Sequence, residues 1–221
     1  ITFGKPGGGK STNTKNFATL MMDFGYKVFV LGDPKDEYEP LCHAFGVQPF
    51  AVGPGMSARI NPLDFGPLGD GWDTLDRVEA QRRSGIIFRG WLTLIRGLVG
   101  SQFIGDQRVP FGPTDARVVE AALADLAGYQ DGHHTLRVTT LPALWQLLAN
   151  PTEQLAAECR YATVRQFLDE TRLLRDALGQ LVTGALAGLF DAPTTIAVDW
   201  TAPIQSFSLS RLEPLGDEAM G

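Results

Sequence analysis

Cysteine, histidine and long apolar runs are all scarce in this sequence, and each scarcity excludes a class of protein. The two cysteines, Cys42 and Cys159, stand in unrelated contexts without metal-ligand spacing, which argues against a disulfide framework and fits a reducing cytosol. The pair His133-His134 has no further ligands around it, so we expect a loop there and not a metal site. Two arginines interrupt the longest apolar stretch, residues 86–99, which therefore predicts a buried helix and not a membrane span.

Basic residues are also fewer than acidic ones. Lys and Arg number 19 against 25 Asp and Glu, and the net charge is −6. This balance argues against a general polyanion-binding surface but is compatible with a local basic patch. The remaining composition, 44% hydrophobic and 20% charged, is that of an ordinary soluble globular protein. The chain starts without Met in a segment that reads as the end of a strand, and we expect an excised piece of a longer protein.

The first third of the chain alternates between strand and helix patterns. Apolar or β-branched runs at residues 1–3, 27–31 and 48–52 predict strands. Residues 38–45 predict a short helix. Residues 11–24 predict a longer one with a core face of Phe17, Leu20, Met21 and Phe24. This order implies a parallel sheet with right-handed crossovers.

The middle of the chain has a different pattern. A Gly-rich linker is expected at residues 67–73, and nearly everything after it has helical periodicity. The sequence predicts helices at residues 115–126 and 142–149. A long helix is expected at residues 164–189, with core candidates Phe167, Leu168, Leu174, Leu178, Leu181 and Leu186.

Strand character returns near the end, at residues 195–198 and 205–209. The expected architecture is therefore an α/β core with a parallel sheet and a large α-helical insertion. In this division residues 1–66 are the first part of the core, residues 67–188 the insertion, and residues 189–221 the return to the core sheet.

One motif carries chemistry on its own. The run Gly4-Lys5-Pro6-Gly7-Gly8-Gly9-Lys10-Ser11 matches the Walker A pattern G-x-x-x-x-G-K-[ST] without a gap, between a strand pattern and a helix pattern. Its glycines allow positive φ and let backbone N–H groups point inward around an anion. The helix that follows adds the positive end of its dipole. The motif predicts a P-loop that binds a nucleoside triphosphate, most simply ATP with Mg²⁺.

The side chains at the end of this loop have separate expected roles. Lys10 supplies a positive charge to the β- and γ-phosphates, and the Ser11 hydroxyl offers Mg²⁺ an oxygen ligand. Thr12, the next residue, is a candidate donor to a phosphate oxygen. The alternative, a Gly-rich turn without a ligand, is disfavoured by the flanking strand and helix patterns.

Four segments resemble those of a known superfamily, and they occur in its order. Residues 28–38 (VFVLGDPKDEY) resemble the second-strand motif of the FtsK–HerA motors, where Glu-Tyr closely follows Asp-Pro. Residues 58–64 (ARINPLD) resemble the INPLD signature of one branch, the "B4" energiser ATPase of conjugation and type IV secretion. Residues 188–194 (GLFDAPT) resemble its GLFDGPT segment, with Ala192 where glycine is usual, and residues 206–212 (SFSLSRL) resemble its FDLSxL strand.

The resemblance implies a P-loop NTPase of RecA-like fold that hydrolyses ATP with Mg²⁺. It also implies a homo-oligomer, for which a hexamer is one option, and contacts with other secretion-system components. The implied location is cytoplasmic, at the inner face of the membrane through partners only. The family's Walker B strand and arginine finger are not found in this chain. Asp199 ends an apolar run and imitates a Walker B acid, but the family order argues against that role.

Two acids after the second predicted strand have open assignments. Glu37 is the candidate that orients the attacking water, because ligands bind at the carboxyl ends of parallel strands. The alternative is that Glu37 is a solvated loop acid and Asp33 caps the next helix. Lys35 is expected to face solvent, and Asn61 and Asp64 are expected to satisfy backbone groups of a turn.

Basic and aromatic residues elsewhere give no sign of a nucleic-acid site. The pair Arg82-Arg83 follows nearby acids and predicts a solvated helix face. The four tryptophans are expected to pack in the core and not to stack on bases. DNA contact is therefore not supported by the charge of the chain.

The leading hypothesis is an ATPase motor domain that powers substrate transfer or pilus assembly, with Lys10 and Glu37 as its catalytic residues. The alternatives are a DNA-pumping translocase of the same superfamily and a non-hydrolysing nucleotide-binding assembly module. A P-loop kinase or transferase would need an acceptor site and an Arg-rich lid, and neither is evident. Without a Walker B strand, this piece is expected to bind nucleotide weakly and to turn it over poorly.

Overall fold

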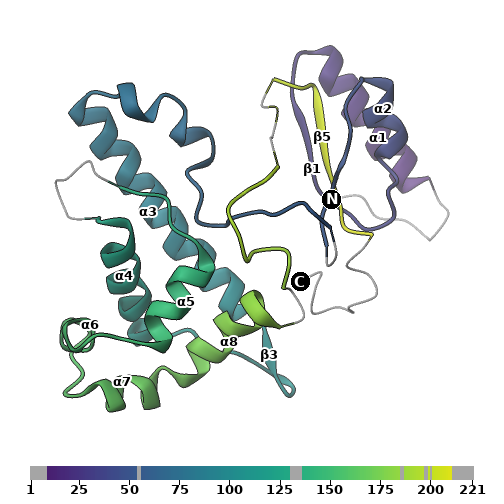
Figure 1. Cartoon of the computed structure of the whole chain (residues 1–221). Helices are drawn as coiled ribbons and strands as arrows, with labels where there is room; N and C mark the ends of the chain where they lie inside the picture. The colour runs from purple at the N-terminus through teal and green to yellow at the C-terminus, as the bar shows by residue number, and fades with distance from the viewer. Residues whose placement is uncertain are drawn as a thin grey trace. The chain divides into compact units, whose positions relative to one another are not determined.

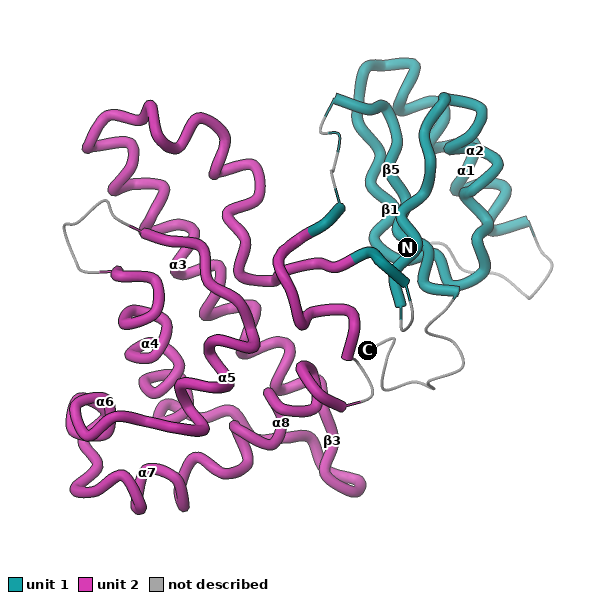
Figure 2. The backbone as a smooth tube through the Cα atoms, in the orientation of Figure 1, with its two compact units in different colours: residues 1–58, 195–220 teal, residues 59–194, 221 magenta. Residues whose placement is uncertain are grey.

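The computed structural model describes residues 9–53, 56–129, 136–184, 187–196, 199 and 201–210. The chain forms two compact units (Figure 2). One unit contains Ile1–Ala58 and Thr195–Met220, and the other contains Arg59–Thr194. The second unit thus includes residues 59–66 and 189–194 in addition to the segment expected as a helical insertion.

The first unit contains a three-stranded parallel sheet in the order β1-β5-β2. β1 (Val28–Asp33) and β2 (Phe50–Ala51) both pair with β5 (Ile204–Ser208), which returns from the far end of the sequence. Val28 lies opposite Ile204 in this register. The parallel α/β sheet expected from the sequence is confirmed, and the segment at residues 205–209 supplies its central strand.

Two helices lie on the same side of this sheet, α1 (Lys10–Asp23) and α2 (Glu39–Ala44) (Figure 1). Met22, Cys42 and Ile204 form a small buried cluster between the helices and the sheet. Gly25, with φ +81°, follows α1 and reverses the chain toward β1. A left-handed residue at this place ends a helix, and glycine adopts it without strain.

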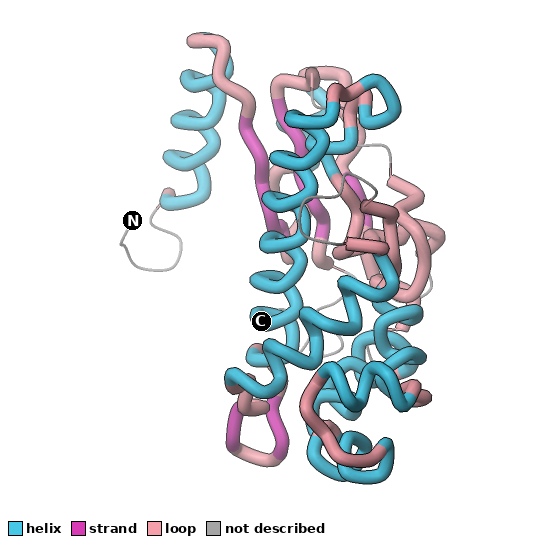
Figure 3. Tube along the Cα trace, turned by 90° about the vertical axis from the view of Figure 1, so that its left-hand side faces the viewer, coloured by secondary structure: helices cyan, strands magenta, loops and turns pink. Residues whose placement is uncertain are grey.

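The buried side of α1 differs from the prediction. Ala18 and Met22 are buried, whereas Phe17, Leu20 and Phe24 are 59%, 53% and 75% exposed. In Figure 3, α1 lies beyond β1, the outermost strand of the sheet among the described residues, and no described strand covers these side chains. Periodicity identified the helix correctly, but it could not show which apolar side chains a neighbouring strand would cover.

The second unit is built from helices. In chain order they are α3 (Arg77–Gly100), α4 (Pro113–Ala127), α5 (Leu141–Ala149), α6 (Glu153–Glu158), α7 (Val164–Glu170) and α8 (Arg172–Thr183). The apolar stretch predicted as a buried helix forms the second half of α3, where Ile87, Trp91, Ile95 and Val99 are buried. Among the described residues, no helix combines the length and the apolar character needed to cross a membrane.

The prediction of one continuous helix at residues 164–189 is wrong. The chain forms α7 and α8 instead, joined at Thr171, and α8 ends at Thr183. The Thr171 side chain is buried and its Oγ1 donates to the carbonyl oxygen of Phe167 at 2.7 Å, a bond that bends helices. The bend lets both short helices bury apolar side chains: Phe167, Leu174, Leu178 and Leu181 are core residues as predicted, and Leu186 lies outside the described residues.

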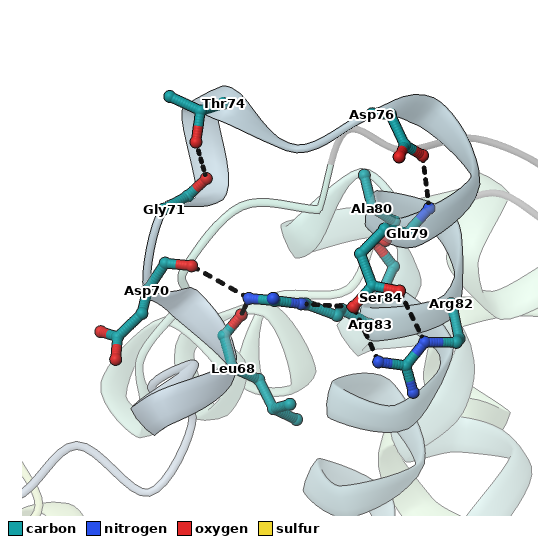
Figure 4. Close-up of polar contacts among 10 residues, drawn as sticks. All are labelled: Leu68, Asp70, Gly71, Thr74, Asp76, Glu79, Ala80, Arg82, Arg83 and Ser84. Carbon is teal, nitrogen blue, oxygen red and sulfur yellow. Dashed lines mark hydrogen bonds and ion pairs between the residues drawn. The ribbon is translucent and has the colours of Figure 1, made fainter. Parts of the chain in front are cut away.

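The expected Gly-rich linker contains two short 3-10 helices, η1 (Gly66–Gly69) and η2 (Trp72–Thr74). The Arg83 guanidinium donates to the carbonyl oxygens of Leu68 and Asp70 at 3.1 and 2.9 Å, which ties this segment to α3 (Figure 4). Arg83 also binds Glu79, so it is more than the solvated residue that was expected. A hairpin of β3 (Phe103–Ile104) and β4 (Gln107–Arg108), which the sequence did not predict, follows α3.

Several sequence predictions fall outside the described residues. They include the first strand at residues 1–3, the His133-His134 loop and Trp200. Of the strand expected at residues 195–198, Thr195 and Ile196 have no strand structure, and the other two residues are not described. Trp72 and Trp91 pack on Phe65, with ring centroids at 4.6 and 6.0 Å, as expected for packing residues.

We expect Ile95→Ala to destabilise the helical unit by about 2–5 kcal/mol, because the side chain is fully buried and its loss leaves a cavity. Urea unfolding followed by circular dichroism measures this change. Leu94→Ala, on the neighbouring position of the same helix, is the control, since Leu94 is 40% exposed. Equal losses in the two variants would show that α3 does not bury the face described above.

Candidate nucleotide-binding site

The end of the phosphate loop lies at the start of α1. Residues 4–8 lie outside the described residues, and Gly9 directly precedes the helix with φ +75° and ψ 14°. A Cβ added at Gly9 would meet no atom within 4 Å, so the left-handed backbone and not a lack of space requires glycine here. This is the backbone form that turns a strand-to-helix loop into the first turn of a helix.

Lys10, Ser11 and Thr12 form the first turn of α1. The first hydrogen bond inside the helix runs from the Asn13 N–H to the Gly9 carbonyl oxygen at 2.9 Å. No side chain caps this end, and the first turn holds no acidic residue. Ser11 and Thr12 are exposed. The turn therefore presents N–H groups, two hydroxyls and a lysine to an incoming anion, which fits the phosphates of a nucleotide.

The turn after β1 is organised by Asp33. Its buried carboxylate accepts from the backbone N–H of Glu37 at 3.0 Å and from that of Tyr38 at 2.7 Å. These bonds shape the turn that leads into α2. Both donors precede the helix, which begins at Glu39 without a side-chain cap, so Asp33 is a turn residue and not the helix cap that was considered. Lys35, in the same turn, is exposed as expected.

The carboxylate of Glu37 lies beside α1. Its Oε2 is 3.8 Å from the Lys15 ammonium, which in turn lies 5.7 Å from the centre of the Tyr38 ring. Burial, followed by the nearby Asp33 and Glu37 carboxylates, raises the pKa of Tyr38. Because Lys15 follows Ser11 by four residues, the two share one face of the helix. Glu37 therefore pairs with a lysine on the face of α1 that carries Ser11, and the sequence analysis did not single out this lysine.

Asp199 lies at the wrong end of the sheet for a Walker B acid. It precedes β5, at the amino ends of the parallel strands, while ligands bind at their carboxyl ends. Its Oδ1 accepts from the N–H and the hydroxyl of Thr201 at 2.8 and 2.6 Å, and these bonds lower its pKa. Asp199 is thus a turn residue, in line with the interpretation drawn from motif order.

Metal ligands are sparse in the described part of the chain. It contains no group of three or more His, Cys, Asp or Glu side chains that could hold an ion. Mg²⁺ in nucleotide sites takes few protein ligands and several phosphate or water oxygens. One hydroxyl, that of Ser11, is therefore a sufficient protein ligand for Mg²⁺, whereas a metal enclosed by protein side chains would need more.

Two segments that carried the family resemblance lie side by side in the helical unit. We call residues 59–64 and 188–194 the paired connectors. The Ile60 N–H donates to the Leu189 carbonyl oxygen at 3.0 Å, and the Asn61 N–H donates to Thr194 Oγ1 at 2.9 Å. Residues far apart in sequence thus form one two-stranded element without regular strand pairing.

An ion pair fastens the same element. Arg59 Nε lies 2.9 Å from Asp191 Oδ1, at an angle outside hydrogen-bond geometry. The other carboxylate oxygen of Asp191 accepts from the Gly188 N–H at 3.0 Å. Both charged side chains are about a quarter exposed, at 25% and 29%, so water screens the pair only in part.

Asn61 is buried, and both the amide nitrogen and the amide oxygen of its side chain make hydrogen bonds. Its Nδ2 donates to the Thr139 carbonyl oxygen at 2.7 Å, and its Oδ1 accepts from the Leu63 N–H at 3.1 Å. The Asp64 Oδ1 accepts from the Phe65 N–H at 2.8 Å, and the Asp64 carbonyl oxygen accepts from the Trp91 indole at 3.2 Å. The turn-forming interpretation of Asn61 and Asp64 therefore agrees with the structure, and Asn61 also joins the connector to the segment before α5.

No family model matches this sequence, and no curated protein does. A solved structure, VirB4 of Thermoanaerobacter pseudethanolicus, matches over 97% of the chain with a TM-score of 0.61 at 20% sequence identity. The chain spans 50% of the length of that chain. The likeness shows the fold alone: the chain shares the α/β fold of that structure. It also agrees with the B4 family that the four sequence segments resemble.

We expect Asn61→Ala to lower stability by about 1–3 kcal/mol, because the buried Thr139 carbonyl and Leu63 N–H both lose a partner. Urea unfolding measures the loss, and Asn150→Ala, which removes only an exposed bond to its own helix, is the control. A variant with unchanged stability and abolished nucleotide turnover would instead place Asn61 in the chemistry.

Proposed function

We propose that this chain is the nucleotide-binding part of a B4-type ATPase that energises a conjugative or type IV secretion system. One observation carries the proposal. A complete Walker A sequence leads through a left-handed Gly9 into α1, in a chain with the fold of VirB4 over 97% of its length. The four family-like segments support the same assignment, because two of them bind each other as the paired connectors.

In this proposal the first turn of α1 binds the triphosphate. The helix N–H groups donate to the phosphate oxygens, Lys10 places its ammonium against the β- and γ-phosphates, and the Thr12 hydroxyl donates to a further oxygen. Ser11 ligates the magnesium ion, which when bound neutralises charge on the phosphates. The remaining glycines and Lys5 and Pro6 of the loop, residues 4–8, complete the cradle.

Glu37 is the proposed residue that orients the attacking water. It follows β1, at the end of the sheet where ligands of parallel α/β folds bind. Asp33 fixes the backbone at Glu37, and Lys15 holds its carboxylate on the Ser11 face of α1. A carboxylate fixed by both its backbone and its side chain accepts a proton from water in a defined direction.

The larger assembly follows from the same assignment. We propose a homo-oligomer that couples ATP hydrolysis to substrate transfer or pilus assembly, in contact with other secretion components at the cytoplasmic face of the membrane. Motors of this kind need neighbouring subunits to complete each site, so turnover is expected to rise with assembly.

We expect Lys10→Ala to weaken Mg-ATP binding about 10- to 100-fold, since a charged hydrogen-bonding partner of the phosphates contributes about 1.5–3 kcal/mol. Titration of a fluorescent ATP analogue in the presence of magnesium measures the affinity. Lys27→Ala is the matched control, because Lys27 is an exposed lysine directly before β1, at the amino end of the sheet and away from the ligand-binding end. Equal affinity of the Lys10 variant and the wild type would refute phosphate binding at α1.

Glu37→Gln is expected to leave ATP affinity within about threefold and to reduce phosphate release about 100-fold or more, as loss of a general base does. Single-turnover measurement separates the two effects. Glu39→Gln, two residues later and paired among the described residues with His43 alone, should change neither. A Glu37 variant with normal phosphate release would return Glu37 to the role of a loop acid that pairs with Lys15.

A further inference from the structure

The exposed face of α3 has a seven-residue repeat. Ile86, Gly90, Thr93 and Gly97 follow the alternating four-three spacing of a helix-packing seam. All four are exposed. A Cβ added to Gly90 or Gly97 would meet nothing within 4 Å, so the described part of the chain does not fill this seam. No described helix of the same unit packs over these four positions.

The seam is a shallow, open depression on the surface of α3. Ile86, Arg89, Gly90, Thr93 and Leu94 line a shallow cavity of about 480 Å³ along the helix. Ile86 and Leu94 are 38% and 40% exposed, and the missing side chain at Gly90 lies between them. Glycines at such positions let two helix backbones approach closely, and large apolar side chains of a partner fill the gap.

A row of arginines follows one flank of the seam. Arg82, Arg89 and Arg96 are seven residues apart, so they occupy equivalent positions on successive pairs of turns. The only acidic residue of α3 is Glu79, and its carboxylate binds Arg82 and Arg83 at 2.7 and 2.8 Å, bonds that lower its pKa to about 2.

The other two guanidinium groups of the row have no acidic partner among the described residues. Arg89 donates its Nε to the carbonyl oxygen of Gly85 in its own helix, at 3.0 Å. Arg96 makes no hydrogen bond or ion pair within the described part of the chain. This concentration of positive charge stands out in a protein whose net charge is −6.

The charge and shape select among possible occupants. A second copy packed antiparallel along the same seam would set the arginine row against itself, and like charges disfavour that pairing. A lipid surface would be met by large side chains that insert, whereas this face offers glycines and a threonine at its centre. Nucleic acid would use the arginines but not the apolar groove.

We propose that the outer face of α3 is a docking groove for an acidic amphipathic helix of a partner protein. The apolar side chains of that helix pack over Gly90 and Gly97, beside Ile86 and Leu94. Acidic side chains on its flank pair with Arg89 and Arg96. The partner is defined by this chemistry, and the inference is independent of nucleotide hydrolysis at the phosphate loop.

The experiment uses the 221-residue chain and two synthetic helical peptides, one with Leu at seam positions and Glu at the flanks, and one with Lys in place of every Glu. Fluorescence anisotropy at low and moderate salt measures their binding. The Glu peptide is expected to bind, the Lys peptide to bind at least about tenfold more weakly, and the double variant Arg89→Glu/Arg96→Glu to reverse this preference. Arg165→Glu/Arg172→Glu, two exposed arginines outside α3, is the matched control and should bind like wild type.

Shape is tested separately from charge. Gly90→Leu/Gly97→Leu keeps every arginine and fills the groove, so it should also abolish binding, and circular dichroism verifies that both double variants fold. Equal binding of the Glu peptide by wild type and the charge-reversed variant would overturn the proposal. So would unchanged binding after the groove is filled, or tighter Arg89- and Arg96-dependent binding to phosphatidylglycerol vesicles or duplex DNA than to the Glu peptide.

Discussion

The pairing of the two connectors is the constraint on which the rest of this structure depends. The chain leaves the first unit near residue 58 and returns near residue 195, and β5 must then enter the sheet between β1 and β2. Closing so long an excursion costs chain entropy. The hydrogen bond from Thr195 to the Ser57 carbonyl in one unit, and the Arg59–Asp191 pair in the other, bind the departing and returning segments together.

The strand pairing of the first unit extends to the candidate site. β5 pairs with β1 up to Asp33, and the Leu209 N–H donates to the Asp33 carbonyl oxygen at 3.0 Å. The side chain of the same aspartate holds the turn that carries Glu37, and Lys15 joins that turn to α1. Within the first unit, hydrogen bonds thus connect β5 through Asp33 to the turn that carries Glu37.

Local signals in the sequence predicted local structure well. Gly9 and Gly25 mark the start and the end of α1 because positive φ leaves a compositional trace, and the β-branched run at residues 28–31 could only be a strand. The same signals could not show that Phe17 and Phe24 face outward, since exposure depends on how far a sheet extends. Nor could they reveal Lys15 beside Glu37 or Arg59 beside Asp191. Those pairs are set by tertiary geometry, and no spacing rule connects their positions.

The net charge of the chain is likewise a poor guide to the charge of one surface. A net charge of −6 argues against a polyanion-binding surface as a whole, yet α3 alone carries five arginines and one glutamate. A sum over the chain averages away such a concentration, whereas binding responds to the field at one face. The α3 arginines also differ among themselves. The Arg83 guanidinium donates to carbonyl oxygens of η1 and of the residue after it, while Arg89 and Arg96 have no acid beside them among the described residues. Structural and available charges of one helix can be separated only when each guanidinium is followed to its partner.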